Sequence, residues 1–403
     1  PSVNFDIGGI NNFLSPFLPA GFYYKTFMWP ASFWEKYEFF IRHSAGLGKA
    51  PTKPDPDIYD HQYAHCDVLV IGGGISGVIA AKLSAEKKLN TILLDDKKDL
   101  GGVSIYNNDD NFKINDQNVS KWLSNEIENL KKYPNLSIKT RTSLAAFHGY
   151  NYLLARENLT DHLNVNDRKD KIRQRLWKIR AKKVVIATGA IERPLIFNNN
   201  DRPGILLSSS IKKYIDYYGV KCGTKISIFT SNDSAYETVL SLYKNGVKVN
   251  SVIDIRDKSE SLIVKKVQDI GIKIYWKHTV VNTKGYKRIN SIELMKLNEK
   301  GTGVIGDKIN ESCDCLGISG GWTPMVHLFT QSGGKLEFNI IDNMFIPDEN
   351  KSPSEQISVG SCNGDLELDD VIKKTNLKTK EFLDINTSIF DSLKIQSSKE
   401  KNK

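Results

Sequence analysis

The glycine-rich stretch Gly72–Gly77, which reads Gly-Gly-Gly-Ile-Ser-Gly, constrains the fold of this chain more than any other feature. An apolar run at Asp67–Ile71 precedes it, and a helical pattern follows it to about Lys88. A second apolar run, Thr91–Leu94, comes after that helix. Strand, glycine-rich turn, helix and strand in this order indicate a parallel βαβ unit that holds a dinucleotide at its first turn.

Three glycines of the turn have separate tasks in such a unit. Gly72 permits the tight turn from strand to helix, Gly74 lets the backbone approach a pyrophosphate, and Gly77 lets helix and strand pack closely. The amides at the start of the helix then face the anion. Asp95 closes the next strand about 20 residues further on, where an acid can bind ribose hydroxyls. The context that a dinucleotide site requires is therefore complete.

The acids after the second strand bear on which dinucleotide binds. Asp95 and Asp96 would repel a 2′-phosphate, which argues against NADP. The neighbouring cations of Lys97 and Lys98 would attract the same phosphate, so NADP is not fully excluded. NAD and FAD both carry an ADP-ribose, which this turn reads identically. Spacing alone therefore leaves NAD and FAD open.

A second unit of the same kind begins with the apolar run Lys225–Phe229 and continues through a helix at Ala235–Lys244 to another strand. Its turn reads Thr-Ser-Asn-Asp-Ser-Ala and contains no glycine. Side chains then occupy the path of a pyrophosphate, and Asp233 or Ser231 is expected to cap the helix instead. We expect this second site to be vestigial.

These patterns predict an α/β fold with two Rossmann-like domains of the FAD/NAD-binding, pyridine nucleotide-disulfide oxidoreductase type, the second inserted in the first. A strand expected at Ile357–Gly360 returns to the first domain, and residues 107–180 are expected to hold an antiparallel excursion and a helix at Val119–Lys131. The predicted boundaries are 1–63 for an aromatic-rich extension and linker, 64–208 with 313–370 for the first domain, 209–312 for the second and 371–403 for a polar tail.

No catalytic or metal-binding set is predicted. Leu100–Val103 stands where disulfide reductases of this architecture carry a redox-active cysteine pair, and no such pair is present. Cys313-Asp314-Cys315 lacks two further ligands at metal spacing, which favours ordinary strand residues over zinc. The seven histidines form no HxxxH or HExxH pattern.

Charge and hydropathy argue against two kinds of partner. The net charge of +9 comes from lysines scattered among acids rather than gathered on one stripe, so nucleic acid is not expected. The longest apolar runs are far shorter than the roughly 20 residues that span a bilayer, so no membrane is expected either. Five cysteines without a paired framework and a start unlike a signal peptide favour the cytoplasm, and the missing initiator Met suggests a fragment.

Aromatic residues crowd the region from Phe13 to Phe40 without strand alternation, and a proline-rich linker follows from Lys49 to His61. Contiguous aromatics are enriched at interfaces. The region is expected either to wrap around the chain's own core or to dock a missing domain or subunit. The sequence leaves both open.

Several segments together resemble one family, the alpha subunit of bacterial heterotetrameric sarcosine oxidase. The match runs from about Phe5 to about Leu368. The segments that carry it are Ala20–Pro30, His65–Gly77, Arg175–Ala181, Ala187–Pro194, Asn200–Gly204 and Ser319–Pro324. Their agreement is more specific than any single motif.

In that family the alpha subunit is similar to a two-dinucleotide flavoprotein yet binds NAD at its first turn. The beta subunit holds FAD and a covalently attached FMN near the subunit interface. The assembled enzyme, with gamma and delta subunits, converts sarcosine, tetrahydrofolate and oxygen to glycine, methylenetetrahydrofolate and hydrogen peroxide. The resemblance therefore implies NAD on this chain and FAD and FMN on a partner.

Carried over residue by residue, the resemblance implies cofactor contacts in the turn, after the second strand, after the double glycine and in the returning segment. These residues are Gly72, Gly74, Ser76 and Gly77; Asp95, Asp96 and Lys97; Gly102 and Val103; and Gly360, Ser361, Leu366 and Leu368. The resemblance assigns no catalytic residue to them.

The sequence departs from the family in three places. A small ferredoxin-like domain is expected before residue 1, and a folate-binding, aminomethyltransferase-like domain is expected after about residue 370, and neither is present here. The polar run Lys373–Lys380 is also expected to replace the helix with which family members continue after Gly364.

Two other functions remain open at this point. One is a subunit of an opine, hydroxyproline or related amine dehydrogenase, which the tryptophan-rich segments fit less well. The other is a free-standing FAD- and NAD-dependent oxidoreductase that moves hydride between its own two cofactors. That function would need a working turn at Thr230–Ala235.

Overall fold

The computed structural model describes residues 9, 11–17, 21, 27, 29–46, 48, 51–106 and 112–397. The chain divides into two compact units, Pro1–Asp57 and Ile58–Lys403. Each is described by itself.

The smaller unit contains short helices and exposed aromatic side chains. Its elements are α1 (Asn11–Leu14), η2 (Ser15–Phe17), η3 (Ala31–Phe33) and α3 (Trp34–Ser44). Phe13, Phe17 and Trp29 are each about four-fifths exposed. Residues 22–26 of the aromatic-rich region lie outside the described residues. Whether this region docks a partner therefore stays a prediction.

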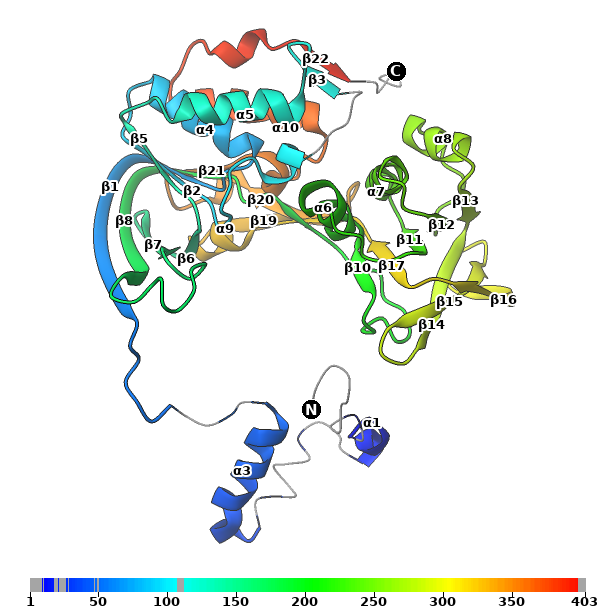
Figure 1. Ribbon diagram of the computed structural model, residues 1–403. Coiled ribbons are helices and arrows are strands. Elements are labelled where there is room, and N and C mark those ends of the chain that lie inside the picture. Colours follow the sequence, from blue (N-terminus) through cyan, green and yellow to red (C-terminus); the bar gives the residue numbers. More distant parts are fainter. Residues whose placement is uncertain are drawn as a thin grey trace. The chain divides into compact units, whose positions relative to one another are not determined.

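The first module of the larger unit is built on a seven-stranded sheet (Figure 1). Its strands in spatial order are β5 (Leu136–Lys139), β2 (Thr91–Leu94), β1 (Ile58–Ile71), β8 (Ile172–Ile186), β7 (Tyr152–Asn158) and β6 (Thr142–His148), with β21 (Gln356–Ser358) paired to β8. The strands β5, β2, β1, β8 and β21 run parallel, whereas β8, β7 and β6 pair antiparallel. The predicted antiparallel excursion and the returning strand are thus confirmed.

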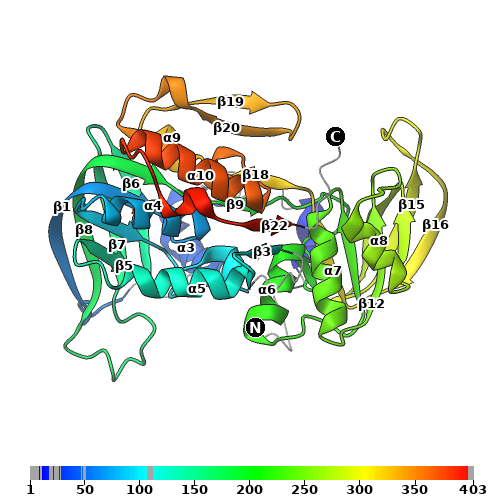
Figure 2. The same cartoon turned by 90° about the horizontal axis from the view of Figure 1, so that it is seen from above.

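Three helices, α4 (Ile75–Glu86), α5 (Val119–Leu130) and α10 (Leu368–Phe382), lie together over one face of this sheet (Figure 2). Ala80, Ala81 and Ala85 leave room for neighbours on every side, so almost all of α4 is buried. On the other face, Phe147 and Leu153 of the antiparallel strands pack into a second core. The helix predicted at Val119–Lys131 is confirmed.

The second module repeats the parallel arrangement. Its sheet has the order β10 (Ile205–Leu207), β17 (Cys315–Ser319), β11 (Ile226–Thr230), β12 (Val249–Asp254) and β13 (Lys273–Trp276). The helices α6 (Ser208–Tyr218), α7 (Ser234–Lys244) and α8 (Leu262–Asp269) pack on one face, and the sheet β14 (His278–Gly285), β15 (Ile289–Leu297) and β16 (Val304–Ser312) packs on the other.

Two paired segments connect the modules. The chain leaves the first module through β9 (Ala190–Glu192) and returns through β18 (Trp322–Pro324), and these two strands pair antiparallel. The remaining elements are β3 (Phe112–Ile114), β4 (Gln117–Asn118), η4 (Gly102–Tyr106), α9 (His327–Gln331), β19 (Lys335–Asn339), β20 (Met344–Asp348), η5 (Glu349–Lys351), η6 (Gly360–Asn363), η7 (Ile389–Ser392) and β22 (Ile395–Ser397). The second module is inserted in the first, as the sequence predicts.

The prediction that Lys373–Lys380 replaces a helix is wrong. This run belongs to α10, whose Val371, Ile372, Thr375 and Thr379 are buried. Its lysines lie on the opposite side, so a segment that is polar on average still presents a continuous packing surface. Beyond α10, β22 pairs with β3. The polar tail predicted for 371–403 is therefore ordered structure as far as Ser397, and residues 398–403 lie outside the described residues.

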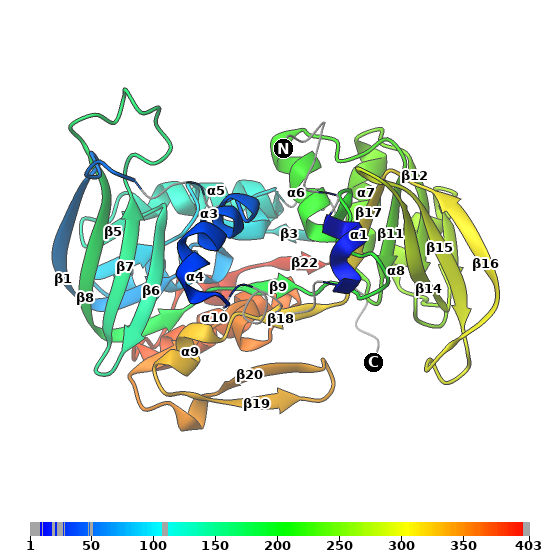
Figure 3. The same cartoon turned by 90° about the horizontal axis from the view of Figure 1, so that it is seen from below.

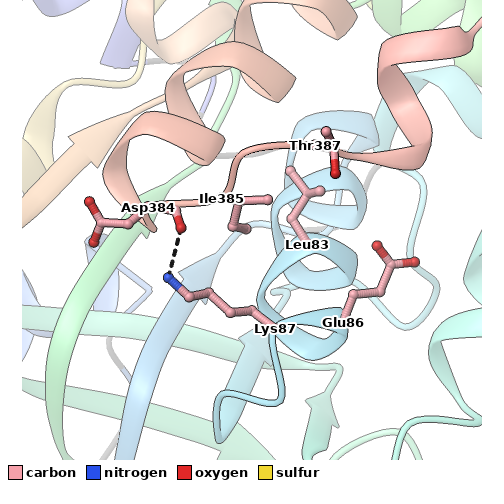
Figure 4. A pocket seen from close by; sticks show the side chains of 6 residues that line it. All are labelled: Leu83, Glu86, Lys87, Asp384, Ile385 and Thr387. Atoms are coloured by element: carbon pink, nitrogen blue, oxygen red, sulfur yellow. Dashed lines mark hydrogen bonds between the residues drawn. The ribbon is translucent and has the colours of Figure 1, made fainter.

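The ends of α4 and α10 meet at a shallow pocket of about 210 Å³ (Figure 4). Lys87, just after α4, donates from Nζ to the carbonyl oxygen of Asp384 at 3.0 Å and to that of Leu383. These carbonyls follow the end of α10, where helix carbonyls lack partners in the helix itself. Lys87 thereby fastens the two helices at this end. Among the described helices, none is long and apolar enough to cross a membrane.

If α10 is part of the folded core, Ile372→Ala should lower the free energy of unfolding by about 2–5 kcal/mol, because Ile372 is buried and its removal leaves a cavity. Leu377→Ala is the matched control on the same helix. Leu377 is 55% exposed, so we expect a loss within about 0.5 kcal/mol. Urea denaturation measures both, and equal losses would contradict the packing of α10.

Candidate dinucleotide-binding site

The glycine-rich turn between β1 and α4 is too crowded for side chains at two positions. Gly72 has a φ of +103°, and a Cβ there would lie 2.3 Å from the carbonyl oxygen of Ala187. A Cβ on Gly77 would lie 1.8 Å from the carbonyl oxygen of Gly72. Both distances are shorter than any allowed contact, so only glycine lets α4 lie against the ends of β1 and β8.

The third glycine faces open space. A Cβ on Gly74 would meet no atom within 4 Å, and its φ of −67° is open to every residue. Gly74 forms an isolated parallel bridge with Gly101, and among the described residues no hydrogen-bond acceptor contacts the amides of Ser76 and Gly77. These amides form the positive end of α4, where an anion is stabilised by donors and helix dipole together. The turn thus has the chemistry of a pyrophosphate site.

A second glycine loop lies against this turn. The amide of Gly101 donates to the carbonyl oxygen of Gly73 at 2.7 Å. A Cβ on Gly102 would lie 3.1 Å from Cα of Gly74, and Val103 beside it is 64% exposed. The structure therefore brings the predicted residues Gly102 and Val103 next to the turn.

Asp95 is buried and braces the turn. Its Oδ2 accepts from the amide of Gly73 at 2.6 Å, and its Oδ1 accepts from the amide of Lys97 at 2.7 Å. Burial raises the pKa of this carboxyl, and the two amides oppose that rise. The sequence predicts that Asp95 binds ribose hydroxyls. In the structure, however, both of its carboxylate oxygens accept hydrogen bonds from amides of the chain itself.

Asp96 is the exposed acid of the pair. Its side chain is 54% exposed and accepts from Lys97 Nζ at 2.5 Å. Of the three residues predicted after β2, Asp96 and Lys97 therefore present their side chains to solvent. Sequence spacing could not separate Asp95 from Asp96, because the kink after the strand decides which of them points inward.

The returning segment closes over the start of α4. Gly360 has a φ of +70°, and a Cβ there would lie 2.2 Å from Oγ of Ser76. Thr375 of α10 donates from its Oγ1 to the same Oγ at 3.1 Å. The Ser76 side chain is thus buried between α4, η6 and α10.

The other residues predicted in this segment lie in η6 and around the first residue of α10. Ser361 is half-buried in η6, Leu366 is 41% exposed, and Leu368 packs against the helix-side core as the first residue of α10. Their contact with a cofactor stays a prediction. Sequence reasoning missed Thr375, because its partner Ser76 lies 299 positions away in the chain.

The turn of the second module is closed by its own side chains. Asn232 accepts from the amide of Ser234 at 3.1 Å through its Oδ1, and Thr230 accepts from the amide of Asn232 at 3.0 Å. The amide of Ser231 donates to the carbonyl oxygen of Ser319. Asp233 occupies the N-cap position of α7, as predicted, but its side chain makes no capping hydrogen bond, and Asn232 supplies the side-chain acceptor instead.

The acid at the end of β12 is closed off as well. Asp254 is fully buried, accepts from the hydroxyl of Tyr236 at 2.9 Å and pairs with Arg256 at 2.8 Å. Arg256 also holds Asp233 at 2.8 Å. Burial, and next the charge of Asp254, raise the pKa of Tyr236, so the phenol remains a donor. These contacts leave Asp254 no exposed oxygen for a ribose.

Cys313 and Cys315 are buried thiols in the second module. Burial raises the pKa of Cys313 and of Cys315 to about 12 in each case, which keeps both protonated. Asp314 between them accepts from Thr224 and Lys225 at the start of β11. Across the described residues, no group of three or more His, Cys, Asp or Glu side chains is arranged to hold a metal ion.

Residues 66–343 match the pyridine nucleotide-disulphide oxidoreductase family, and this range includes both modules. The chain belongs to that family.

Within it, the sequence is similar to the sarcosine oxidase subunit alpha of Rhizobium meliloti (strain 1021), with 38% identity over 336 residues that cover 83% of this chain and 32% of that protein. The sarcosine oxidase subunit alpha of Corynebacterium sp. (strain U-96) is 34% identical over 305 residues, 75% of this chain and 31% of that protein. The resemblance predicted from sequence is confirmed, and the chain spans about a third of the length of these relatives.

Solved structures agree on the fold. A thioredoxin reductase from T. acidophilum superposes with a TM-score of 0.59 at 16% identity and covers 80% of this chain and 97% of its own. An L-proline dehydrogenase from P. horikoshii superposes with a TM-score of 0.58 at 19% identity over 87% of this chain and 63% of its own. At these identities the likeness shows the two-module fold alone.

Asp95→Asn should change how stability depends on pH. Because the pKa of Asp95 is raised in the folded state, its contribution to the unfolding free energy is complete below its ordinary pKa near 3.8 and is lost as pH rises through the raised value. The unfolding free energy of the wild type minus that of the variant should therefore fall with pH over this window. Urea denaturation at a series of pH values measures it, and a difference that rises instead would contradict the burial of Asp95.

Proposed function

We propose that this chain is the dinucleotide-binding core of a sarcosine oxidase alpha subunit. In this role it binds one NAD in the first module and docks a beta subunit that carries FAD and FMN. The assembly, with gamma and delta subunits, converts sarcosine, tetrahydrofolate and oxygen to glycine, methylenetetrahydrofolate and hydrogen peroxide. The observation that carries the proposal is a contrast between the two turns: the amides of Ser76 and Gly77 have no acceptor among the described residues, whereas side chains of the turn Thr230–Ser234 accept from its own amides.

The first turn fits a dinucleotide. The open space at Gly74 and the free amides of α4 would hold the pyrophosphate, since both the donors and the room for the anion are present. Asp96 would bind ribose hydroxyls, and its charge would repel the 2′-phosphate of NADP. Gly102 and Val103 would flank the cofactor on one side, and Gly360 and Ser361 on the other.

The second module supports a scaffold role rather than a relay between two cofactors. When bound, NAD supplies a nicotinamide ring that can accept or donate a hydride. A relay within this chain would need a second nucleotide at the turn after β11, and the side chains of Asn232 and Thr230 already take the amides there. The chain therefore holds its cofactor without a partner site of its own.

Gly74→Val tests the site. A branched side chain would stand where the pyrophosphate approaches, so we expect the NAD released on denaturation to fall at least about tenfold. Gly149→Val is the matched control, because a Cβ on Gly149 also meets no atom within 4 Å, far along the chain in the β6–β7 loop. Liquid chromatography of the released nucleotide identifies it, and circular dichroism checks the fold.

Two results would overturn this assignment. Stoichiometric FAD in the released fraction, with bleaching of the flavin by NADH, would show a free-standing oxidoreductase instead. Equal NAD content in Gly74→Val and Gly149→Val would show that the nucleotide binds elsewhere.

A further inference from the structure

The antiparallel part of the first sheet has one face that points away from the core formed by Trp177, Ile179 and Leu153. The register aligns Tyr63 of β1 with Lys178 of β8 and Leu154 of β7, and aligns His65 with Arg180 and Tyr152. Residues directly opposite each other point to the same side of a sheet. Figure 3 shows the four strands β1, β8, β7 and β6 side by side. We call the surface formed by Tyr63, His65, Tyr152, Arg156, Lys178 and Arg180 the outer face.

The alternating residues confirm which side points outward. Trp177 and Ile179, on either side of Lys178, are buried in the core beneath the strands. Tyr63 is 70% exposed, and Arg156 and Arg180 are exposed too.

The outer face carries no carboxylate. The four strands contain three acids, and Asp60 and Glu157 point inward. Asp60 pairs with Arg175 at 2.9 Å, and Glu157 accepts from Nε1 of the buried Trp177 at 2.7 Å. Asp67, which follows His65 on the outward side of β1, is already paired with Lys182 at 2.8 Å, so none of these acids neutralises Arg156, Lys178 or Arg180.

Tyrosine rings hold two of these cations in place. Nζ of Lys178 lies 5.0 Å from the ring centre of Tyr63 and donates to its hydroxyl at 3.3 Å. Cζ of Arg180 lies 5.0 Å from the ring centre of Tyr152, and its Nη1 donates to the carbonyl oxygen of Tyr150 at 2.9 Å. Side chains ordered in advance lose less conformational freedom on binding.

The composition is that of an interface rather than of an ordinary sheet surface. Leu154 and Leu176, which are partly buried, lie between the tyrosines and the cations. Tyr and Arg are enriched in interface cores, and Asp and Glu are depleted there. A surface with one sign of charge selects a partner with the opposite sign.

We propose that the outer face docks an acidic protein partner, which places carboxylates opposite Arg156, Lys178 and Arg180 and an apolar side chain over Leu154 and Leu176. The inference rests on the subunit role proposed above and names the docking surface for it. A protein is favoured over single-stranded nucleic acid, because each of the two tyrosine rings already carries a cation of this chain and the leucines need an apolar cover.

The test uses the full chain co-expressed with the beta, gamma and delta subunits of its own organism. The double variant Arg156→Glu/Arg180→Glu should weaken binding of one subunit at least tenfold, since each substitution sets like charges against each other. The control is Lys221→Glu/Lys300→Glu, which makes the same change of charge at two exposed sites in the second module. Biolayer interferometry at two salt concentrations measures affinity, and wild-type binding should weaken with salt.

A second measurement does not depend on charge reversal. A photo-crosslinking amino acid at Tyr63 should couple to an acidic segment of that subunit, whereas the same amino acid at Tyr286, which is 88% exposed in the second module, should not. Released NAD is measured in every sample, so that loss of the cofactor site is distinguished from loss of docking.

Three results would overturn the proposal. The first is equal affinity of the two double variants for every subunit, with no crosslink from Tyr63, which would leave the subunit role intact and place docking elsewhere. The second is binding of a polyuridylate tracer that Arg156→Glu/Arg180→Glu abolishes while subunit binding stays unchanged, which would assign the face to nucleic acid. The third is wild-type chain that binds none of the subunits, which would remove the proposed subunit role together with the docking surface.

Discussion

The close approach of main chain to main chain at the first turn is the constraint on which the rest of the first module depends. With hydrogen in place of a Cβ at Gly72 and Gly77, α4 lies directly on the ends of β1 and β8. This position lets the returning segment pack onto α4 through Gly360, Ser76 and Thr375. It also leaves the amides of Ser76 and Gly77 without an acceptor among the described residues. Packing and the capacity to bind an anion thus have the same origin.

The two modules use one topology with opposite results. In both, a strand leads through a turn into a helix, and an aspartate ends the following strand. In the first module, Asp95 braces the turn by accepting from Gly73, and the helix amides stay free. In the second, Asn232 takes a helix amide, and Tyr236 and Arg256 enclose Asp254. Hydrogen bonds that satisfy a turn internally remove the donors on which a phosphate would depend.

Much of this architecture could be predicted from the sequence, because glycine spacing and apolar runs are local signals. The strand–turn–helix units, α5 and the return of β21 follow from them. The sequence could not reveal that α10 packs, because its lysines dominate the average hydropathy, and several of the residues that face the core, such as Thr375 and Thr379, are polar. Nor could it reveal which of Asp95 and Asp96 points inward, or that Asn232 rather than Asp233 supplies the side-chain acceptor at the start of α7. These assignments depend on the path of the chain through a turn. There, a shift of one position decides whether a side chain is buried or exposed.

We propose that the chain has one open nucleotide-binding site and a second that is closed by its own side chains. Hydrogen–deuterium exchange with and without NAD distinguishes the two, because the readout is local to each turn. We expect NAD to slow exchange of the amides at Gly74–Gly77 and at Gly102, and to leave those at Ser231–Ser234 unchanged. Slower exchange at Ser231–Ser234, or none at Gly74–Gly77, would contradict it.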